Sequence, residues 1–340
     1  MKKNVVTQND IAKELNLSRI TVSKVLNGTG KVNQKTRDIV INKAKEMGYK
    51  FFSQIYNNTS NETESKNYRI ITLLFTTSYD SSYWSRILYG ISAALSKRNI
   101  NNEIVLITEN AKSTLDLPKS LFESNIDGII TMGEIPDFLY EYFSKNNTPV
   151  SFIGVKTKFI STTRSDIITS DNIYAYKELV NILFEKGYKK FAYIGPKLEE
   201  LSITERWNGF LIGLYNNGIK INQNLIYING TNNHFSKYNV LQALNNFTEQ
   251  PDVIFCANDL IGSIVYDFIQ KGHDFLKNDV VIVGYDYSYE FRNLYSKLYN
   301  VDSRPEDISY EAVESIIGKI QNPESPQKLI KIMPKIIIPE

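Results

Sequence analysis

The segment VTQNDIAKELNLSRITVSKVLN, residues 6–27, is the most informative stretch because it predicts two short helices in succession. Thr7 is placed to cap the first helix, with Asp10 three residues later as in a capping box, and Ser18 is placed to cap the second. The residues expected to be buried recur at the spacing of one helix face: Ile11, Ala12, Leu15, Val22, Val25 and Leu26. The three- or four-residue turn around Asn16 has the length of the connection in a helix-turn-helix motif.

A third helix is expected to begin near Asn33. Its buried residues would be Val40, Ala44 and Met47. The outer face of the second helix then stays free and carries Arg19, Ile20, Ser23 and Lys24. In the major groove of DNA, Arg19 can bond O6 and N7 of guanine, and Ile20 can contact a thymine methyl group. The simpler interpretation of Arg19 and Lys24 is a solvated helix face.

Positive charge is concentrated at the N-terminus. Residues 1–60 carry eleven Lys and Arg against four Asp and Glu, a net charge of +7, whereas the whole chain carries +2. The remaining residues therefore carry −5. A basic head on an acidic body favours a polyanionic partner for the head alone.

The rest of the chain has a different pattern. Residues 57–67 are polar and predict a flexible linker. From about Tyr68, short apolar runs alternate with amphipathic stretches, which is typical of parallel sheets covered by helices on both faces. The expected helices include residues 84–97, 173–186, 205–217, 259–271 and 308–320. The expected strands are Ile70–Phe75, Ile104–Ile107, Gly128–Met132, Val150–Gly154, Phe191–Gly195, Val253–Ala257 and Val280–Gly284. We therefore expect an α/β body with two similar lobes and a cleft at the carboxyl ends of the strands.

The sequence does not support several other classes of protein. The single cysteine, Cys256, cannot form an internal disulfide, and no apolar stretch reaches the roughly 18 residues of a membrane span. Lys2 and Lys3 precede a polar segment instead of the apolar core of a signal peptide, so we expect a cytoplasmic protein without a membrane partner. His234 and His273 lack metal-ligand spacing, and no phosphate loop, dinucleotide fingerprint or nucleophile elbow is present. We expect neither an enzyme nor a cofactor.

Four motifs follow one another in the head: Val6-Thr7-x-x-Asp10-Ile11-Ala12, Leu17-Ser18-x-x-Thr21-Val22-Ser23-Lys24-Val25-Leu26-Asn27, Val32-x-x-Lys35-Thr36-Arg37 and Gly48-Tyr49. They resemble the signature of the lactose/galactose-repressor family of bacterial transcription regulators. Looser matches to the same family in the body are Ile126–Ile130, Glu185–Gly195, Glu205–Phe210, Ala257–Asp259 and Val283–Asp286. The resemblance runs from Val6 to about Pro334.

The resemblance implies a body with the fold of periplasmic sugar-binding proteins. The chain would then divide into a helix-turn-helix head at 1–56, a linker at 57–67 and an effector-binding and dimerisation body at 68–340. The first lobe would hold residues 68–171 and 303–332, and the second lobe would hold residues 172–302 and 333–340.

The resemblance also implies which head residues touch DNA. Arg19, Ile20 and Lys24 would read bases. Near the phosphates it places Thr7, Ser18, Thr21, Ser23, Asn27 and Lys31. Family members usually continue with a proline-containing segment and a hinge helix whose leucine enters the minor groove. Here residues 50–58 contain no proline and Asn58 stands at the expected leucine, so kinking of DNA is less strongly implied than major-groove binding.

The effector-binding candidates are Arg206, Asn258, Asp286, Asp171, Trp84 and Phe235. Arg206, Asn258 and Asp286 fall where the family places effector-contacting side chains, and their polar groups suit sugar hydroxyls. Alternative interpretations stay open, because Asn258 and Asp171 can each cap the helix that follows. Trp84 can equally be a buried aromatic residue at a helix start.

We therefore expect a sequence-specific DNA-binding transcriptional regulator, and specifically a repressor. A small-molecule effector such as a sugar, bound between the lobes, would control it. A homodimer would present two heads to the half-sites of a double-stranded operator. The segment Tyr79–Ile87 resembles a galactoside-responsive branch of the family. The alternative is a family member controlled by a protein co-repressor instead of a sugar.

Overall fold

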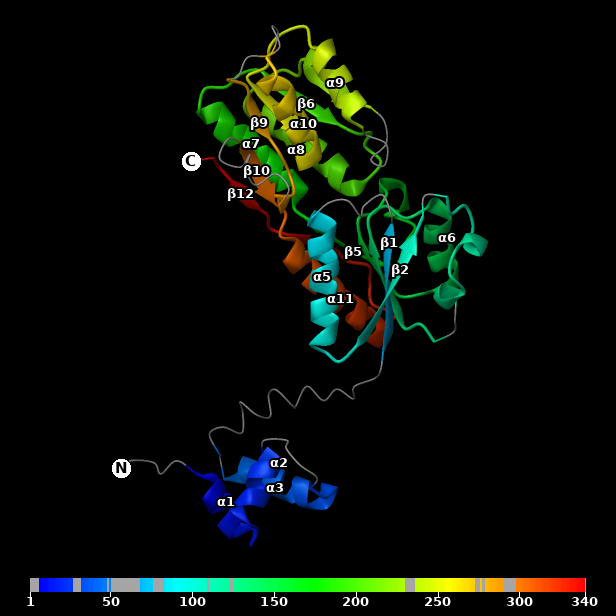
Figure 1. Cartoon of the computed structure of the whole chain (residues 1–340), viewed down its shortest axis with the longest axis vertical. Helices are drawn as coiled ribbons and strands as arrows, with labels where there is room; N and C mark the ends of the chain where they lie inside the picture. The colour runs from blue at the N-terminus through cyan, green and yellow to red at the C-terminus, as the bar shows by residue number, and fades with distance from the viewer. Residues whose placement is uncertain are drawn as a thin grey trace, which may run out of the picture. The chain divides into compact units, whose positions relative to one another are not determined.

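The computed structural model describes residues 6–26, 32–47, 49, 68–75, 82–108, 110–122, 125–229, 236–272, 276, 279–289 and 298–339. The chain forms two compact units, Met1–Lys66 and Asn67–Glu340 (Figure 1). We call them the head and the body and describe each by itself. No helix among the described residues is both long enough and apolar enough to span a membrane.

The head contains the three expected helices, α1 (Gln8–Glu14), α2 (Arg19–Leu26) and α3 (Gln34–Glu46). The predicted capping box is present, since the Thr7 hydroxyl accepts from the Asp10 amide and the Asp10 carboxylate accepts from the Thr7 amide at 2.8 Å. The Thr21 amide donates to Ser18 Oγ at 3.0 Å, so the predicted cap of α2 is confirmed as well. Asn16 lies in the turn at φ 52°, a left-handed conformation that asparagine tolerates well.

The core of the head joins one face of each helix. Its fully or nearly fully buried side chains are Ile11, Ala12, Val22, Val25, Leu26, Val40, Ala44 and Tyr49. The prediction that Met47 is buried with them holds only in part, because Met47 follows α3 and packs on this core while partly exposed.

The body contains two six-stranded sheets, one in each lobe. The first sheet has the order β11-β5-β4-β3-β1-β2, and its paired strands are parallel throughout. Its strands are β1 (Arg69–Phe75), β2 (Asn101–Ile107), β3 (Gly128–Met132), β4 (Val150–Ile153), β5 (Asp166–Ser170) and β11 (Leu329–Ile332).

The second sheet has the order β12-β10-β9-β8-β6-β7. Its strands are β6 (Phe191–Gly195), β7 (Ile226–Ile228), β8 (Val253–Cys256), β9 (Val281–Val283), β10 (Leu298–Asp302) and β12 (Lys335–Ile337). The expectation of parallel sheets is confirmed with one exception, because β12 runs antiparallel to β10 with Asn300 opposite Ile337.

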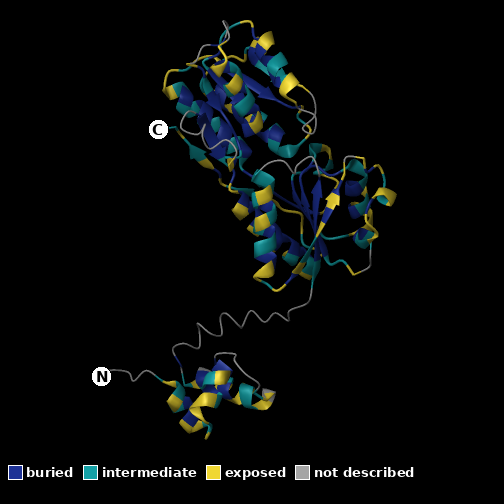
Figure 2. Cartoon of the chain, in the orientation of Figure 1, coloured by how far each residue is buried: buried dark blue, intermediate teal, exposed yellow. Residues whose placement is uncertain are grey.

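Helices cover both sheets, as the alternating pattern predicts. In the first lobe, α5 (Ser82–Ser96) and α11 (Pro305–Gln321) lie side by side over one face, and α6 (Asp137–Asn146) packs on the other (Figure 1). The second lobe carries α7 (Asn172–Glu185), α8 (Leu201–Asn216), α9 (Lys237–Asn246) and α10 (Asp259–Gln270). Nearly all residues of the central strands are buried (Figure 2), as the burial of both sheet faces requires.

The chain passes between the lobes three times. It leaves the first sheet after β5 and enters α7, returns after β10 into α11, and leaves again after β11 to reach β12. In a parallel sheet the loops after the strands gather at one edge, and these loops carry most of the candidate effector residues.

Candidate functional site

The outer face of α2 carries the candidate base-reading residues of the head. Ile20 is 67% exposed although Val22 and Val25 beside it are buried. Arg19 and Lys24 are exposed on the same helix, and Ser23 is partly buried. An exposed isoleucine between two exposed cations is poorly suited to water alone, and it suits a surface that offers both phosphates and methyl groups.

The candidate phosphate-contacting hydroxyls lie at the starts of the first two helices. Thr7 Oγ1 donates to the Asp10 carboxylate at 2.7 Å, and Ser18 Oγ and Thr21 Oγ1 are 2.8 Å apart. These hydroxyls therefore have a structural role in the helix caps before any ligand arrives. Asn27 and Lys31 lie outside the described residues.

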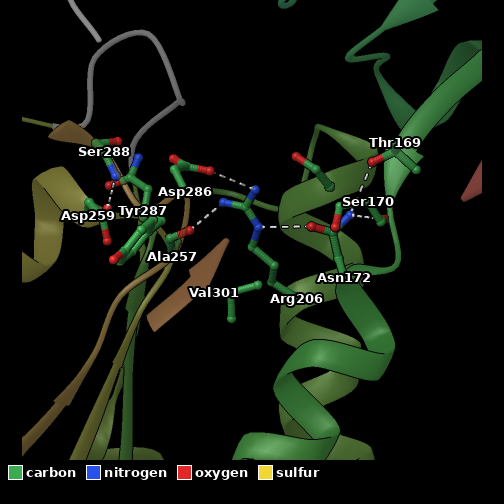
Figure 3. Close-up of polar contacts among 12 residues, drawn as sticks. Thr169, Ser170, Asn172, Arg206, Ala257, Asp259, Asp286, Tyr287, Ser288 and Val301 are labelled. Atoms are coloured by element: carbon green, nitrogen blue, oxygen red, sulfur yellow. Dashed lines mark hydrogen bonds and ion pairs between the residues drawn. The ribbon is translucent and has the colours of Figure 1, made fainter. Parts of the chain in front are cut away.

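In the body, Arg206 is the centre of the candidate effector site (Figure 3). Its Nη1 donates to the carbonyl of Ala257 at 2.5 Å and its Nε donates to Asn172 Oδ1 at 3.1 Å. Its Nη2 lies 3.5 Å from Asp286 Oδ1, and the guanidinium carbon is 3.6 Å from the ring centroid of Tyr285. The side chain is only 9% exposed, so these contacts hold the guanidinium in one orientation.

Burial is the largest single influence on the pKa of Arg206 and lowers it, but Asp286, Tyr285, Tyr176 and Glu200 together raise it by more, so the guanidinium stays charged. The pKa of Asp286 rises to about 6 because burial disfavours its charged form more than Arg206 favours it. Asp286 also has φ 101°, and Tyr287 has φ 51°, both in the left-handed region that non-glycine residues rarely adopt. Such strain concentrates at functional sites.

Of the two aromatic residues at the start of α5, Tyr83 lies near enough to this group to interact with Asp286 and Arg206, whereas Trp84 is partly buried and packs on the core of the first lobe. Tyr83 and Trp84 begin α5, with ring centroids 4.9 Å apart in an edge-to-face arrangement. The pKa of Tyr83 is raised first by burial and then by Asp286. The Tyr289 amide of the second lobe donates to Ser82 Oγ at 2.8 Å, so the start of α5 touches the second lobe directly. Tyr83 was not among the predicted site residues, although it is the neighbour of Trp84.

For Asn258 and Asp171 the structure shows the capping interpretation. Asn258 Oδ1 accepts from the Ile261 amide at 3.0 Å, and Asp171 Oδ1 accepts from the Tyr174 amide at 3.2 Å. The adjacent carbonyl of Ala257 is nevertheless bonded to Arg206, so Asn258 lies beside the Arg206 group. Asp171 lies 4.0 Å from Lys331 Nζ at the crossovers. Phe235 lies outside the described residues.

The sequence did not single out the network behind Arg206. Asn172 is fully buried, and its Nδ2 donates to the carbonyl of Ser170 at 2.8 Å and to Glu205 Oε2 at 3.2 Å (Figure 3). Glu205 Oε1 is 2.7 Å from Lys331 Nζ, at the end of β11. Arg206 is thus tied to the first and third crossovers through its neighbour Glu205 and through Asn172. In the sequence, only the polar pair Asp171-Asn172 at the start of α7 could have indicated this network.

Within the described residues, no group of three or more His, Cys, Asp or Glu side chains could hold a metal ion. The head offers a solvent-facing cationic helix, and the body offers the nearly buried Arg206–Asp286 pair beside the ring of Tyr285.

Both parts of the chain match described families. Residues 7–50 match the bacterial regulatory proteins of the lacI family. Residues 69–335 match the periplasmic binding proteins and sugar binding domain of the LacI family. The HTH-type transcriptional regulator RegA of Clostridium saccharobutylicum is 25% identical over 327 residues, which are 93% of this chain and 92% of RegA.

Solved structures have the same fold. The complex of the transcriptional regulator CelR with cellobiose has a TM-score of 0.67 at 21% identity and covers 98% of both chains. The lac repressor dimer bound to operator and the anti-inducer ONPF has a TM-score of 0.64 at 19% identity, again over 98% of both chains.

Proposed function

Because this chain belongs to the LacI family of bacterial regulatory proteins, a family of DNA-binding transcriptional regulators and not of enzymes, we propose that it is a homodimeric repressor controlled by a sugar. Its head would bind double-stranded operator DNA, and its body would bind the effector between the two lobes. The match of the body to a sugar-binding domain favours a small molecule over a protein co-repressor.

The division of labour along the chain follows from this proposal. Residues 1–56 would bind DNA, residues 57–67 would link head and body, and residues 68–340 would bind the effector and pair with a second chain. The lobe boundaries would be those expected from the sequence, with the crossovers near residues 171, 303 and 332. A homodimer suits a near-palindromic operator because both have twofold symmetry.

The observation that carries the DNA-binding part is the exposed Ile20 between Arg19 and Lys24 on a helix whose other face is buried. We assign base contacts to these three residues. Thr7, Ser18, Thr21 and Ser23, together with Asn27 and Lys31, would contact phosphates.

The effector part rests on the fixed Arg206 guanidinium beside the Asp286 carboxylate, with Tyr83 of the first lobe near both and Trp84 in contact with Tyr83. Paired donors and acceptors suit vicinal hydroxyls, and the aromatic rings suit the apolar face of a sugar ring. CelR, a structural neighbour, is solved with cellobiose, which is a sugar of this kind. Asn258, Asp171 and Phe235 are further effector candidates of the proposal.

A binding assay tests the function as a whole. The full chain is titrated onto a labelled duplex from the upstream region of its own gene, in competition with a random duplex, with and without cellobiose, lactose or a galactoside. We expect preference for the native duplex and a change in affinity with at least one sugar, because an effector acts only through unequal affinity for two conformations. Equal affinity for both duplexes at moderate salt would exclude the regulatory role.

A further inference from the structure

A short segment joins the two lobes outside the three crossovers. Lys156, in the loop after β4 of the first lobe, forms an antiparallel bridge with Glu200, which precedes α8 of the second lobe. The Thr157 amide donates to the carbonyl of Glu199 at 2.8 Å, and the Leu201 amide donates to the carbonyl of Val155 at 2.9 Å. We call residues 199–201 the latch.

The latch also packs on the first lobe through its side chains. Leu201 lies against the apolar core of the first lobe that surrounds α6. Glu200 Oε1 lies beside Gly154: a Cβ atom added to Gly154 would lie 3.5 Å from Glu200 Oε1 and 3.2 Å from Gly133 Cα. The Glu200 carboxylate, which accepts from Ser202 Oγ at 2.8 Å, therefore reaches the carboxyl ends of β3 and β4.

The bridge places Glu200 near the loop after β3, and this loop carries a second carboxylate, that of Glu134. Glu134 follows β3 and is only 9% exposed. The pKa of Glu200 rises to about 7, first because of burial and then because of the Glu134 charge. Ionisation of Glu200, which is partly buried, therefore places a second negative charge near Glu134 between the lobes, which is unfavourable.

The other charged and titratable groups around Glu200 come from several elements. Arg206 on α8 stabilises its charge, whereas Asp286 after β9 opposes it. The hydroxyl of Tyr140 on α6 accepts from the Lys156 amide at 3.3 Å. The Lys156 ammonium pairs with Asp137 at 2.7 Å. Tyr83 on α5 is raised in pKa by Glu200 among other groups.

We propose that the latch holds the effector cleft closed and that it releases the first lobe when Glu200 loses its proton beside Glu134. The inference rests on the proposed function, because the latch leads directly into α8, which carries Arg206. The proton leaves to solvent, and opening of the lobes hydrates the two carboxylates. Effector binding and release are thereby linked to pH, with the closed form favoured below neutrality and the open form above it.

The test uses the full chain without sugar or DNA. The chain has two tryptophans, Trp84 and Trp207, so Trp207→Phe leaves Trp84, whose ring contacts that of Tyr83, as the only one. We expect acrylamide quenching of Trp84 to increase with pH in a titration centred near the pKa of Glu200, about 7. Glu200→Gln in the same background should abolish this titration. Glu199→Gln is the matched control, because Glu199 is exposed and contributes to the latch only through its carbonyl.

A second measurement needs no substitution. Hydrogen exchange of the Thr157 and Leu201 amides, corrected for the intrinsic effect of pH, should lose protection above pH 7 relative to the core strands. Quenching and protection that do not change with pH would overturn the latch. A titration of Trp84 quenching that survives Glu200→Gln would overturn it as well, because that titration would then belong to Asp286. Because neither measurement contains operator or effector, such a result would leave the proposed function standing. If the pH dependence were found but the protein did not bind its operator, the latch would stand and only the proposed regulatory role would be refuted.

Discussion

The close approach of α8 to α7 at Gly209 predicts that one added methyl group destabilises the second lobe. A Cβ atom added at Gly209 on α8 would lie 2.5 Å from the carbonyl oxygen of Ile173 and 3.0 Å from its Cα, both backbone atoms of α7. Backbone atoms cannot rotate away, so α7 and α8 must separate by about half an ångström or more. Forced overpacking of this kind costs about 1–3 kcal/mol, whereas alanine gains about 1 kcal/mol over glycine in a helix interior.

We therefore expect Gly209→Ala to lower the free energy of unfolding by up to about 2 kcal/mol after the helix propensity is included. Gly318→Ala is the matched control, because Gly318 is exposed on α11 and an added Cβ would meet nothing within 4 Å. That variant should gain about 1 kcal/mol from propensity alone. Urea unfolding followed by Trp207 fluorescence, with all variants in a Trp84→Phe background, reports on α8 itself.

The same variant should weaken effector binding, since Arg206 lies one turn before Gly209 and bonds to Asn172 at the start of α7. Separation of the two helices lengthens that bond and moves the guanidinium. If Gly209→Ala were as stable as Gly318→Ala, the close approach of α7 and α8 in this structure would be wrong.

Three further predictions concern charged residues. Arg19→Ala should weaken operator binding by about 1–3 kcal/mol if the guanidinium reads a guanine, with the melting of the head unchanged; a loss that is equal on random DNA would contradict base reading. Lys331→Met should lower the free energy of unfolding, measured by thermal unfolding, by about 1–3 kcal/mol, because it leaves the buried Glu205 carboxylate without its ion pair. The control Lys335→Met, at an exposed residue of the edge strand, should leave the free energy of unfolding nearly unchanged. The pKa of Asp286 is raised from 3.8 to about 6, so the stability that this group contributes is complete below pH 4 and is lost as the pH rises through 6. Asp286→Asn should remove this decrease of the free energy of unfolding with pH, which amounts to about 1–3 kcal/mol in all. If the decrease stayed unchanged in the variant, it would belong to another group.

The strands that the sequence predicts are those with uninterrupted apolar runs, such as β3 and β6, whose bounds agree with the structure. Burial on both faces of a parallel sheet produces such runs directly. The prediction omitted β5, which begins with Asp166, a residue 1% exposed. Its carboxylate accepts from Ser315 Oγ at 3.0 Å and from the Lys328 amide at 2.9 Å, and these partners lie about 150 residues or more away.

Strand β10 was missed for the same reason. Its Asn300 is fully buried and donates to Asp259 Oδ1 at 2.6 Å, so a polar residue occupies a central strand at no loss of hydrogen bonding. The edge strands β7, β11 and β12 are only partly buried and lack a clear apolar pattern. The local sequence pattern thus predicts strands whose buried residues are apolar. It does not predict strands whose buried polar residues depend on hydrogen-bond partners far away in the sequence.

The sites divide in the same way. The caps at Thr7, Ser18 and Asn258 follow from spacing of three residues, and the structure contains each of them. Arg206 and Asp286 are 80 residues apart, and only the family resemblance placed both in one cleft. Glu200 carries no local signal, because its significance comes from a contact with the other lobe.

One helix joins these observations. The first turns of α8 carry the latch at Glu200, the crossover contact at Glu205, the effector contact at Arg206 and the close approach to α7 at Gly209. A small shift of α8 when Arg206 engages a ligand must therefore disturb contacts to the first lobe, to β11 and to the first crossover at the same time. Packed contacts of this kind switch between discrete arrangements instead of deforming gradually. We infer that the start of α8 is where ligand binding becomes a change in lobe orientation, so substitutions there should alter the effect of the sugar on operator affinity more than substitutions of equal size at its end.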